Sequence, residues 1–507
     1  MTSRERIRER MSNVDTAWLR MDRPENLMQI LGVMIFDGRM DYERLKRTVA
    51  HRMLRYRRFR QIATQEGNGA WWADDANFDI DAHVRHSILP APGDKNELQK
   101  FVAEMASEPL NPSRPRWEFH LVETSEGYSA LVARIHHAIA DGIALIGVLN
   151  SLTDEHVDAP EDGGLAPWKL DTTSAEEAPD THENDLFWRW IYEPMTDATL
   201  ASIRIGGKLW SKYLGLLSNP AKAFDYARIA GAIAKEVGKL AMMPNDTATR
   251  FKGKPGTVKR VAWSEPMSLS EVKAVGKVLG CSVNDMLLSS VAGALRGYLQ
   301  AKGDSVLDAE IRALVPVNLR APGDIEDLGN RFGLVALELP VGIENPLARV
   351  YETRARMAAL KGSYQAMLTF TILGAVGMAP KFIQDQVLDL LASKATAVMT
   401  NVPGPQQSRY FAGATLKQQM VWVPQSGDVG MGVSILSYDG KVQFGLITDK
   451  NMVDDPERIV ERFAIEFEKL LWLVLMEPWE RLADPDTVED GLNEELAEAH
   501  REARGAD

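Results

Sequence analysis

The sequence predicts an α/β protein built from two similar halves. Its 507 residues exceed what one hydrophobic core usually supports, and 45% hydrophobic with 25% charged residues is typical of a globular chain. Segments with strand periodicity alternate with segments of helix periodicity before residue 153 and again after residue 256. Each of these regions also contains two adjacent strand segments around a short turn, which indicates related architecture in both halves.

The first half has a helix, a strand pair and a second helix in that order. Residues 41–56 have the spacing of a helix, and "WEFHLVET" (117–124) and "YSALVARIH" (128–136) alternate as strands around a turn. The run "IALIGVLNSL" (143–152) has helical character. The stretch "HHAIADG" therefore lies at a sharp turn between a strand and a helix.

The middle of the chain changes composition twice. Residues 153–185 are acidic and proline-containing with little periodicity, which predicts a surface linker. Residues 201–260 are basic with interspersed apolar side chains, which is typical of an amphipathic helix lying on an anionic membrane or packed across both halves. We therefore expect a first half with its linker at 1–185, a helical connector at 186–250, and a second half at 251–507.

The second half repeats the alternation of strands and helices. The segments expected are a strand at 257–267, a helix after the capping box of Ser268 and Glu271, a long helix at 283–300, strands at 311–319 and 333–341, a helix at 346–360, and a hairpin turning at Asp439 and Gly440. This last hairpin resembles the one at 117–136 but has no histidine pair. Only the first half is therefore expected to be catalytic.

Composition excludes several classes of function. The net charge of -13 argues against nucleic acid as a partner, and the lone Cys281 excludes an internal disulfide and a multi-cysteine metal site. The N-terminal residues lack the apolar stretch of a secretory signal, so a cytoplasmic protein is expected. The uncharged run 362–380 is interrupted by two glycines and a proline, which favours a buried or interfacial helix over a membrane span.

The adjacent His136 and His137 are the candidate chemical centre. Histidine suits general base catalysis near neutral pH, and strand alternation sends the two rings to opposite faces. Asp141 has the spacing to return to the turn, towards a histidine ring or a distant arginine, and Gly142 permits backbone angles that a side chain forbids. A metal site would need a further ligand cluster that the sequence lacks, so no metal is expected. A structural histidine pair stays an alternative.

Ordered motifs along the chain connect this centre to a family. The pattern His-His-x-x-x-Asp-Gly resembles the signature of CoA-dependent acyltransferases of the chloramphenicol acetyltransferase type. The further motifs are "NVDTAWLRMDRPENLMQI", "SRPRWEFHLVE", "VNDMLL", "PVNLR", "LGNRFG" and "NVPGP", in that order. Together they resemble the bacterial wax ester synthase/diacylglycerol acyltransferase family over almost the whole chain. The resemblance implies two chloramphenicol-acetyltransferase-like halves, each a mixed sheet flanked by helices, with a tunnel between them.

The resemblance also implies a reaction and a set of roles. Acyl-CoA and a long-chain alcohol or a diacylglycerol would enter the tunnel, with His137 as the base and no acyl-enzyme. Asn284 is our candidate for stabilising the oxyanion, because an amide and a helix N-terminus both favour negative charge; its structural alternative is an N-cap. We assign His136, Asp141 and Gly142 to the frame of the loop, and Asp285 to support of the Asn284 motif. The substrate-binding residues are not assigned.

Some features leave alternatives open. Arg320 and Arg331 are both candidates for the partner of Asp141, and the basic cluster at 52–60 either contacts CoA phosphates or forms a solvated helix face. Arg116 stands where the family usually has leucine, which puts an arginine near the acyl channel or at the surface. Cys281 is expected to be a small buried apolar residue.

The expected partners are acyl-CoA as co-substrate, the acyl acceptor, and a membrane or lipid-droplet surface that the protein binds peripherally; no cofactor is expected. Two other functions compete with this one. The first is a condensation-type acyltransferase that uses a carrier-protein thioester. The second is a lipid-binding protein on the same fold without catalytic activity.

Overall fold

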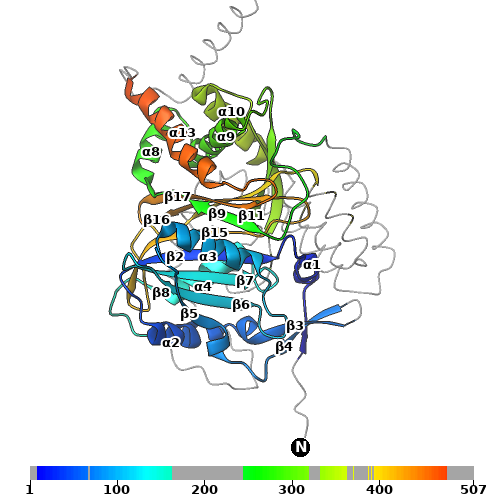
Figure 1. The fold of residues 1–507 in the computed structure, drawn as a ribbon, viewed down its shortest axis with the longest axis vertical. Helices are drawn as coiled ribbons and strands as arrows, with labels where there is room; N and C mark the ends of the chain where they lie inside the picture. Colours follow the sequence, from blue (N-terminus) through cyan, green and yellow to red (C-terminus); the bar gives the residue numbers. More distant parts are fainter. Residues whose placement is uncertain are drawn as a thin grey trace, which may run out of the picture.

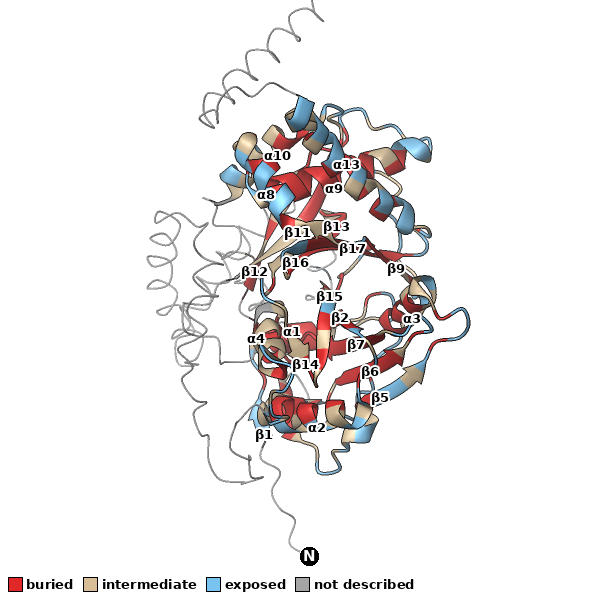
Figure 2. Ribbon diagram, turned by 90° about the vertical axis from the view of Figure 1, so that its left-hand side faces the viewer, coloured by how far each residue is buried: buried red, intermediate tan, exposed pale blue. Residues whose placement is uncertain are grey.

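Two large sheets, one above the other in Figures 1 and 2, form most of the described part of the protein. The computed structural model describes residues 8–66, 69–162, 244–318, 330, 332–361, 369, 386, 390 and 393–476. The expected linker beyond residue 162, most of the basic connector, and the run 362–380 apart from Thr369 lie outside these residues. The prediction of an α/β fold with two halves is confirmed.

The first sheet has the strand order β5–β6–β7–β2–β15–β14–β8 in the described residues. Its strands are β2 (Gln29–Asp37), β5 (Val84–Ile88), β6 (Trp117–Glu123), β7 (Ser129–His136), β8 (Thr153–Asp154), β14 (Tyr410–Phe411) and β15 (Ala414–Trp422). A smaller sheet beside it contains β1 (Arg8–Arg10), β4 (Gly69–Asp74) and β3 (Gln61–Glu66). The hairpin expected at 117–136 is confirmed as β6 and β7, with Leu121 opposite Leu131.

Helices cover both faces of this first sheet. They are α1 (Asn13–Met21), α2 (Tyr42–Arg52), α3 (Lys95–Ser107) and α4 (Gly142–Leu152). Alternation along β2 directs Leu31 and Val33 to the side of α3, and Ile30 and Met34 to the side of α1, α2 and α4. One face of the sheet therefore packs against α3, and the other builds the core that carries the histidine pair.

The second sheet has the strand order β10–β17–β16–β13–β11–β12, with β9 also paired to β17. Its strands are β9 (Lys259–Trp263), β10 (Met267–Ser268), β11 (Ile311–Asn318), β12 (Phe332–Leu339), β13 (Ala397–Pro403), β16 (Met431–Tyr438) and β17 (Lys441–Asp449). The helices α8 (Leu269–Val278), α9 (Val283–Ala301), α10 (Pro346–Lys361) and α13 (Glu457–Met476) cover one face of it. The hairpin turns at Asp439 and Gly440 as predicted, and the structure gives both residues positive φ.

The second half of the chain contributes two strands to the first sheet. Strand β15 pairs with β2 from the first half, with Met420 opposite Val33, and β14 pairs with β8. The range 251–507 that we expected to form the second half therefore contributes to both sheets. Strand β15 also contacts β16 and β17. It therefore joins the first sheet to the face of the second sheet that α8, α9, α10 and α13 leave uncovered, which we call the free face.

No single helix among the described residues is long and apolar enough to cross a bilayer. The helices α8 and α9 meet that requirement only when taken together, and they are bent by 98° where they join.

Candidate active site

His137 lies in the connection between β7 and α4, where its backbone is fixed from two directions. Its amide donates a hydrogen bond to the Met28 carbonyl at 2.7 Å. Its carbonyl accepts one from Nδ2 of Asn330, in the second half, at 2.9 Å. Residues nearly two hundred positions away in sequence thus help to place this residue.

The neighbouring His136 lies on the other side of the strand end, as the alternation predicts. Its Nδ1 accepts a hydrogen bond from the Ala138 amide at 3.1 Å, and its Nε2 lies 3.6 Å from the Asp22 carboxylate. Asp22 also accepts a hydrogen bond from Arg116 at 3.3 Å. Arg116, for which we expected a place near the acyl channel or at the surface, thus belongs to the framework behind His136.

Asp141 shapes the turn that follows the histidine pair. Its carboxylate accepts a hydrogen bond from the Ala144 amide at 3.0 Å and so caps the first turn of α4. Arg320 and Arg331, the expected partners of Asp141, lie outside the described residues, so that pairing stays a prediction.

One expectation about this turn is wrong. Gly142 is not among the glycines with positive φ, and a Cβ placed there would meet no atom within 4 Å. Gly142 lines the cavity beside Asp141, so its missing side chain leaves space in the cavity and does not serve an unusual backbone angle.

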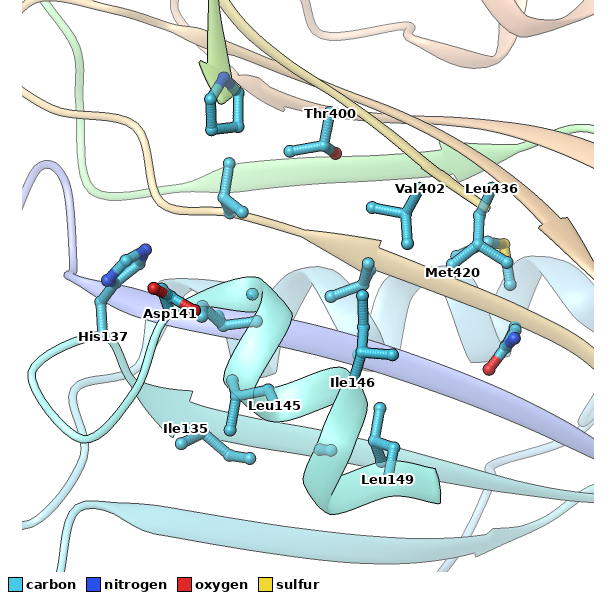
Figure 3. A pocket seen from close by; sticks show the side chains of 18 of the residues that line it. Ile135, His137, Asp141, Leu145, Ile146, Leu149, Thr400, Val402, Met420 and Leu436 are labelled. Carbon is cyan, nitrogen blue, oxygen red and sulfur yellow. The ribbon is translucent and has the colours of Figure 1, made fainter. Parts of the chain in front are cut away.

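A cavity of about 350 Å³ opens beside His137, between the two halves (Figure 3). Its lining is mainly apolar and comes from the face of β2 and β7, from α4, and from the free face of the second sheet. Figure 3 shows His137 and Asp141 at one end of it, with Leu149 from α4 and Leu436 from β16 towards the other. The arrangement suits a long apolar chain whose reacting group stops at the imidazole.

Burial sets the protonation state of this imidazole. His137 is 3% exposed, and burial lowers its pKa to about 4, against an opposing effect of the Asp141 carboxylate. Burial likewise lowers the pKa of His136. At neutral pH His137 is therefore uncharged and able to accept a proton.

Aromatic rings enclose the His137 side chain. The indole of Trp18 stacks on the imidazole with 4.2 Å between ring centroids and 21° between planes, and Phe332 lies 5.4 Å away in a tilted contact. The motif "NVDTAWL" around Trp18 carried the family resemblance, but sequence reasoning assigned it no role. The signal in this motif is the spacing of Asp15 and Trp18, because residues three positions apart lie on the same face of a helix and can face one site.

Asn284 lies one hydrogen bond behind the cavity lining, because its partner Asn401 lines the cavity. Asn284 is exposed, does not line the cavity, and accepts a hydrogen bond from Nδ2 of Asn401 at 2.8 Å. Its alternative as an N-cap is wrong, because Ser282 caps α9 in a capping box with Asp285. The supporting role expected of Asp285 thus has a geometric basis, whereas the oxyanion role of Asn284 stays a prediction without one.

The remaining candidate residues lie away from the cavity. In the basic cluster, Arg52 is buried against Asp154 at 2.8 Å, and Arg57 pairs with Asp74 at 2.8 Å. Neither arginine lines the cavity, so their placement gives no support to a phosphate site. Cys281 is buried, as expected. Within the described residues, no group of three or more His, Cys, Asp or Glu side chains is arranged to hold a metal ion.

Comparison with known families decides which protein class this geometry belongs to. Residues 11–287 match the wax ester synthase/diacylglycerol acyltransferase catalytic domain, and residues 328–471 match the C-terminal domain of the same family. The chain belongs to the wax ester synthase/diacylglycerol acyltransferase family. It is therefore an acyltransferase, and the resemblance inferred from the ordered motifs is confirmed.

Individual relatives of this acyltransferase agree with that membership. A "probable diacylglycerol O-acyltransferase" of Mycobacterium tuberculosis is 26% identical over 389 residues, which cover 76% of this chain and 77% of the relative. The wax ester synthase/diacylglycerol acyltransferase of Marinobacter aquaeolei has a similar structure, with a TM-score of 0.64, 20% identity, and coverage of 91% and 98%. A condensation domain of the calcium-dependent antibiotic synthetase has a TM-score of 0.55 at 14% identity, with coverage of 92% and 96%. These two structures show the shared fold.

Proposed function

We propose that this acyltransferase moves a long-chain acyl group from acyl-CoA to the hydroxyl of a fatty alcohol or a diacylglycerol, with His137 as the general base. The observation that carries the proposal is the uncharged, buried imidazole at one end of an apolar cavity built by both halves. Long-chain substrates fit such a cavity, and a neutral imidazole can accept a proton from a hydroxyl.

The reaction passes one proton from the acceptor hydroxyl to the imidazole and then from the imidazolium to the leaving thiolate. Nε2 or Nδ1 of His137 takes the hydroxyl proton while the alcohol oxygen attacks the thioester carbonyl. When the tetrahedral intermediate collapses, the carbon–sulfur bond breaks and the imidazolium returns the proton to the CoA thiolate. The products are one ester and one free thiol, and no covalent acyl-enzyme is formed. The main work of the cavity is to hold both substrates in line with the imidazole.

The experiment that tests the function measures both products together. Purified protein is incubated with palmitoyl-CoA and hexadecanol, dioleoylglycerol or hexadecylamine, and free thiol and acylated product are quantified. We expect one thiol per ester with at least one of the hydroxyl acceptors and little amide from the amine. If neither hydroxyl acceptor yields ester, or if only the amine is acylated, the proposal is wrong.

The burial of His137 predicts an unusual pH profile. Because the imidazole loses its basic form only as pH falls through its own pKa, kcat/KM should stay level from about pH 8 to pH 6 and fall by half near about pH 4. Circular dichroism at each pH defines the range in which the protein stays folded. An acid limb centred at about 6.5, the ordinary histidine value, would show that His137 is not buried in the free enzyme.

We also propose that the protein is cytoplasmic and associates peripherally with a membrane or lipid droplet. The proposed acceptors and products partition into lipid, and the end of α13 exposes Trp472, Leu475 and Met476 by 60 to 79%. In a flotation assay at low salt, the protein should rise with vesicles that contain anionic lipid. Complete retention in the soluble fraction would contradict the proposal.

A further inference from the structure

Helix α1 presents two buried residues to the site of His137. Asp15 and Trp18 are 7% and 5% exposed and stand three positions apart, so they project from one face of the helix. Neither residue has a role in the proton transfers described above. Their burial beside the imidazole therefore needs another explanation.

The second half contributes a matching pair at the start of β12. Nδ2 of Asn330 has two hydrogens, and it donates to Asp15 at 2.8 Å and to the His137 carbonyl at 2.9 Å. Two residues further on, the Phe332 ring lies 5.7 Å from Trp18 and 5.4 Å from the imidazole. His137 is thus held between α1 of one half and β12 of the other.

We propose that Asp15 and Trp18 are positioning residues for His137. Asp15 acts through Asn330 and fixes the His137 backbone, and Trp18 fixes the ring plane and stabilises the imidazolium formed during the reaction. This inference rests on the proposed role of His137 as the base. It also makes the reaction rate depend on contact between the two halves, because α1 comes from the first half and Asn330 and Phe332 come from the second.

The stack of Trp18 on His137 acts through the indole face. An aromatic face attracts a cation placed over it, so the indole favours the imidazolium more than it favours the neutral ring. The indole Nε1 is buried and has no hydrogen-bond partner among the described residues. The face is therefore the functional part, and phenylalanine should replace tryptophan better than leucine does.

The test compares kcat and KM of Trp18→Leu and Trp18→Phe. Because the stack acts on the imidazolium, Trp18→Leu should lower kcat by about 5- to 30-fold. Trp18 also lines the cavity, so KM is measured in the same series to separate a change in substrate binding from the loss of the stack. Trp18→Phe should recover most of the lost rate. The matched control is Trp72→Leu, which removes an indole that is 2% exposed in β4 and does not line the cavity. It should lower thermal stability without lowering kcat of the folded protein.

A second pair of variants tests Asp15 independently. Asp15→Asn keeps an oxygen that accepts the hydrogen bonds from Asn330, whereas Asp15→Leu removes the acceptor of both the Asn330 Nδ2 hydrogen and the Asn330 backbone N–H. We expect Asp15→Leu to lower kcat by about tenfold or more through displacement of His137, and Asp15→Asn to recover most of it. If Trp18→Leu does not fold, Trp18→Met and the Asp15 pair carry the test.

The outcomes that overturn the inference differ from those that overturn the proposed function. If Trp18→Leu and Asp15→Leu fold and keep the parent kcat, or change only KM, the two residues do not position the base. His137→Ala is measured in the same series. If His137→Ala keeps the parent kcat, the proposed function itself is wrong, whatever the Trp18 and Asp15 variants show.

Discussion

His137→Ala should lower kcat for ester formation by about 10²- to 10⁴-fold, which is what a positioned general base typically contributes. The loss falls on kcat because the imidazole acts on the transferred proton, whereas the apolar cavity that binds the acyl chain stays in place. Rates are measured from thiol release with saturating palmitoyl-CoA and the better of the two hydroxyl acceptors.

The control for this variant removes a histidine outside the cavity. His86→Ala breaks a contact of His86 with Glu123 at 2.9 Å on β5, and it should leave kcat unchanged. If His137→Ala folds and retains more than about a tenth of the parent kcat, the imidazole is not the base.

Lys259→Met should lower the free energy of unfolding by about 3 to 5 kcal/mol, because it leaves a buried carboxylate without its counter-charge. The Lys259 amine lies 2.9 Å from the Asp449 carboxylate and 3.0 Å from Oδ1 of Asn26. Asp449 is fully buried. Since Asn26 lies in the loop that leads to Met28, the same cluster ties the second half to the backbone contact of His137.

Urea denaturation followed by circular dichroism measures this loss. Lys95→Met is the matched control, because Lys95 forms an exposed pair with Glu265 that is worth about 0 to 1 kcal/mol. The double variant Lys259→Met/Asp449→Leu should regain much of the stability, since it removes the unpaired charge. A Lys259→Met variant as stable as Lys95→Met would contradict the account of this cluster.

The local structure of the chain was predictable because it depends on neighbours in sequence. Alternation gave β6 and β7, the Asp-Gly turn gave the hairpin at 431–449, and apolar spacing gave α4 and α9. The place of β15 was not predictable, because its pairing with β2 depends on a partner almost four hundred residues away. Sequence periodicity identifies a strand but not the sheet that it joins.

The site was predictable only in its centre. The motif identified His137, and alternation separated it from His136, but Asp22, the partner of His136, gave no sequence signal. Gly142 was assigned a role from its residue type, and the structure shows no positive φ there. Asn284 was assigned one from its amide and its place at a helix N-terminus, and the structure shows it bonded to Asn401. Groups that hold the base through tertiary contacts were missed because they are distant from it in sequence: Trp18 comes from α1 of the same half, and Asn330 comes from the other half.

Direct transfer by a neutral imidazole is tested by mixing the enzyme with palmitoyl-CoA in the absence of an acceptor. Intact-protein mass spectrometry and free thiol are followed over time, and hexadecanol or dioleoylglycerol is then added. We expect no palmitoyl adduct and little thiol until the acceptor arrives, then ester formation that His137→Ala slows by about 10²-fold or more. A burst of one thiol per protein with a palmitoylated chain, before any acceptor is added, would contradict direct transfer.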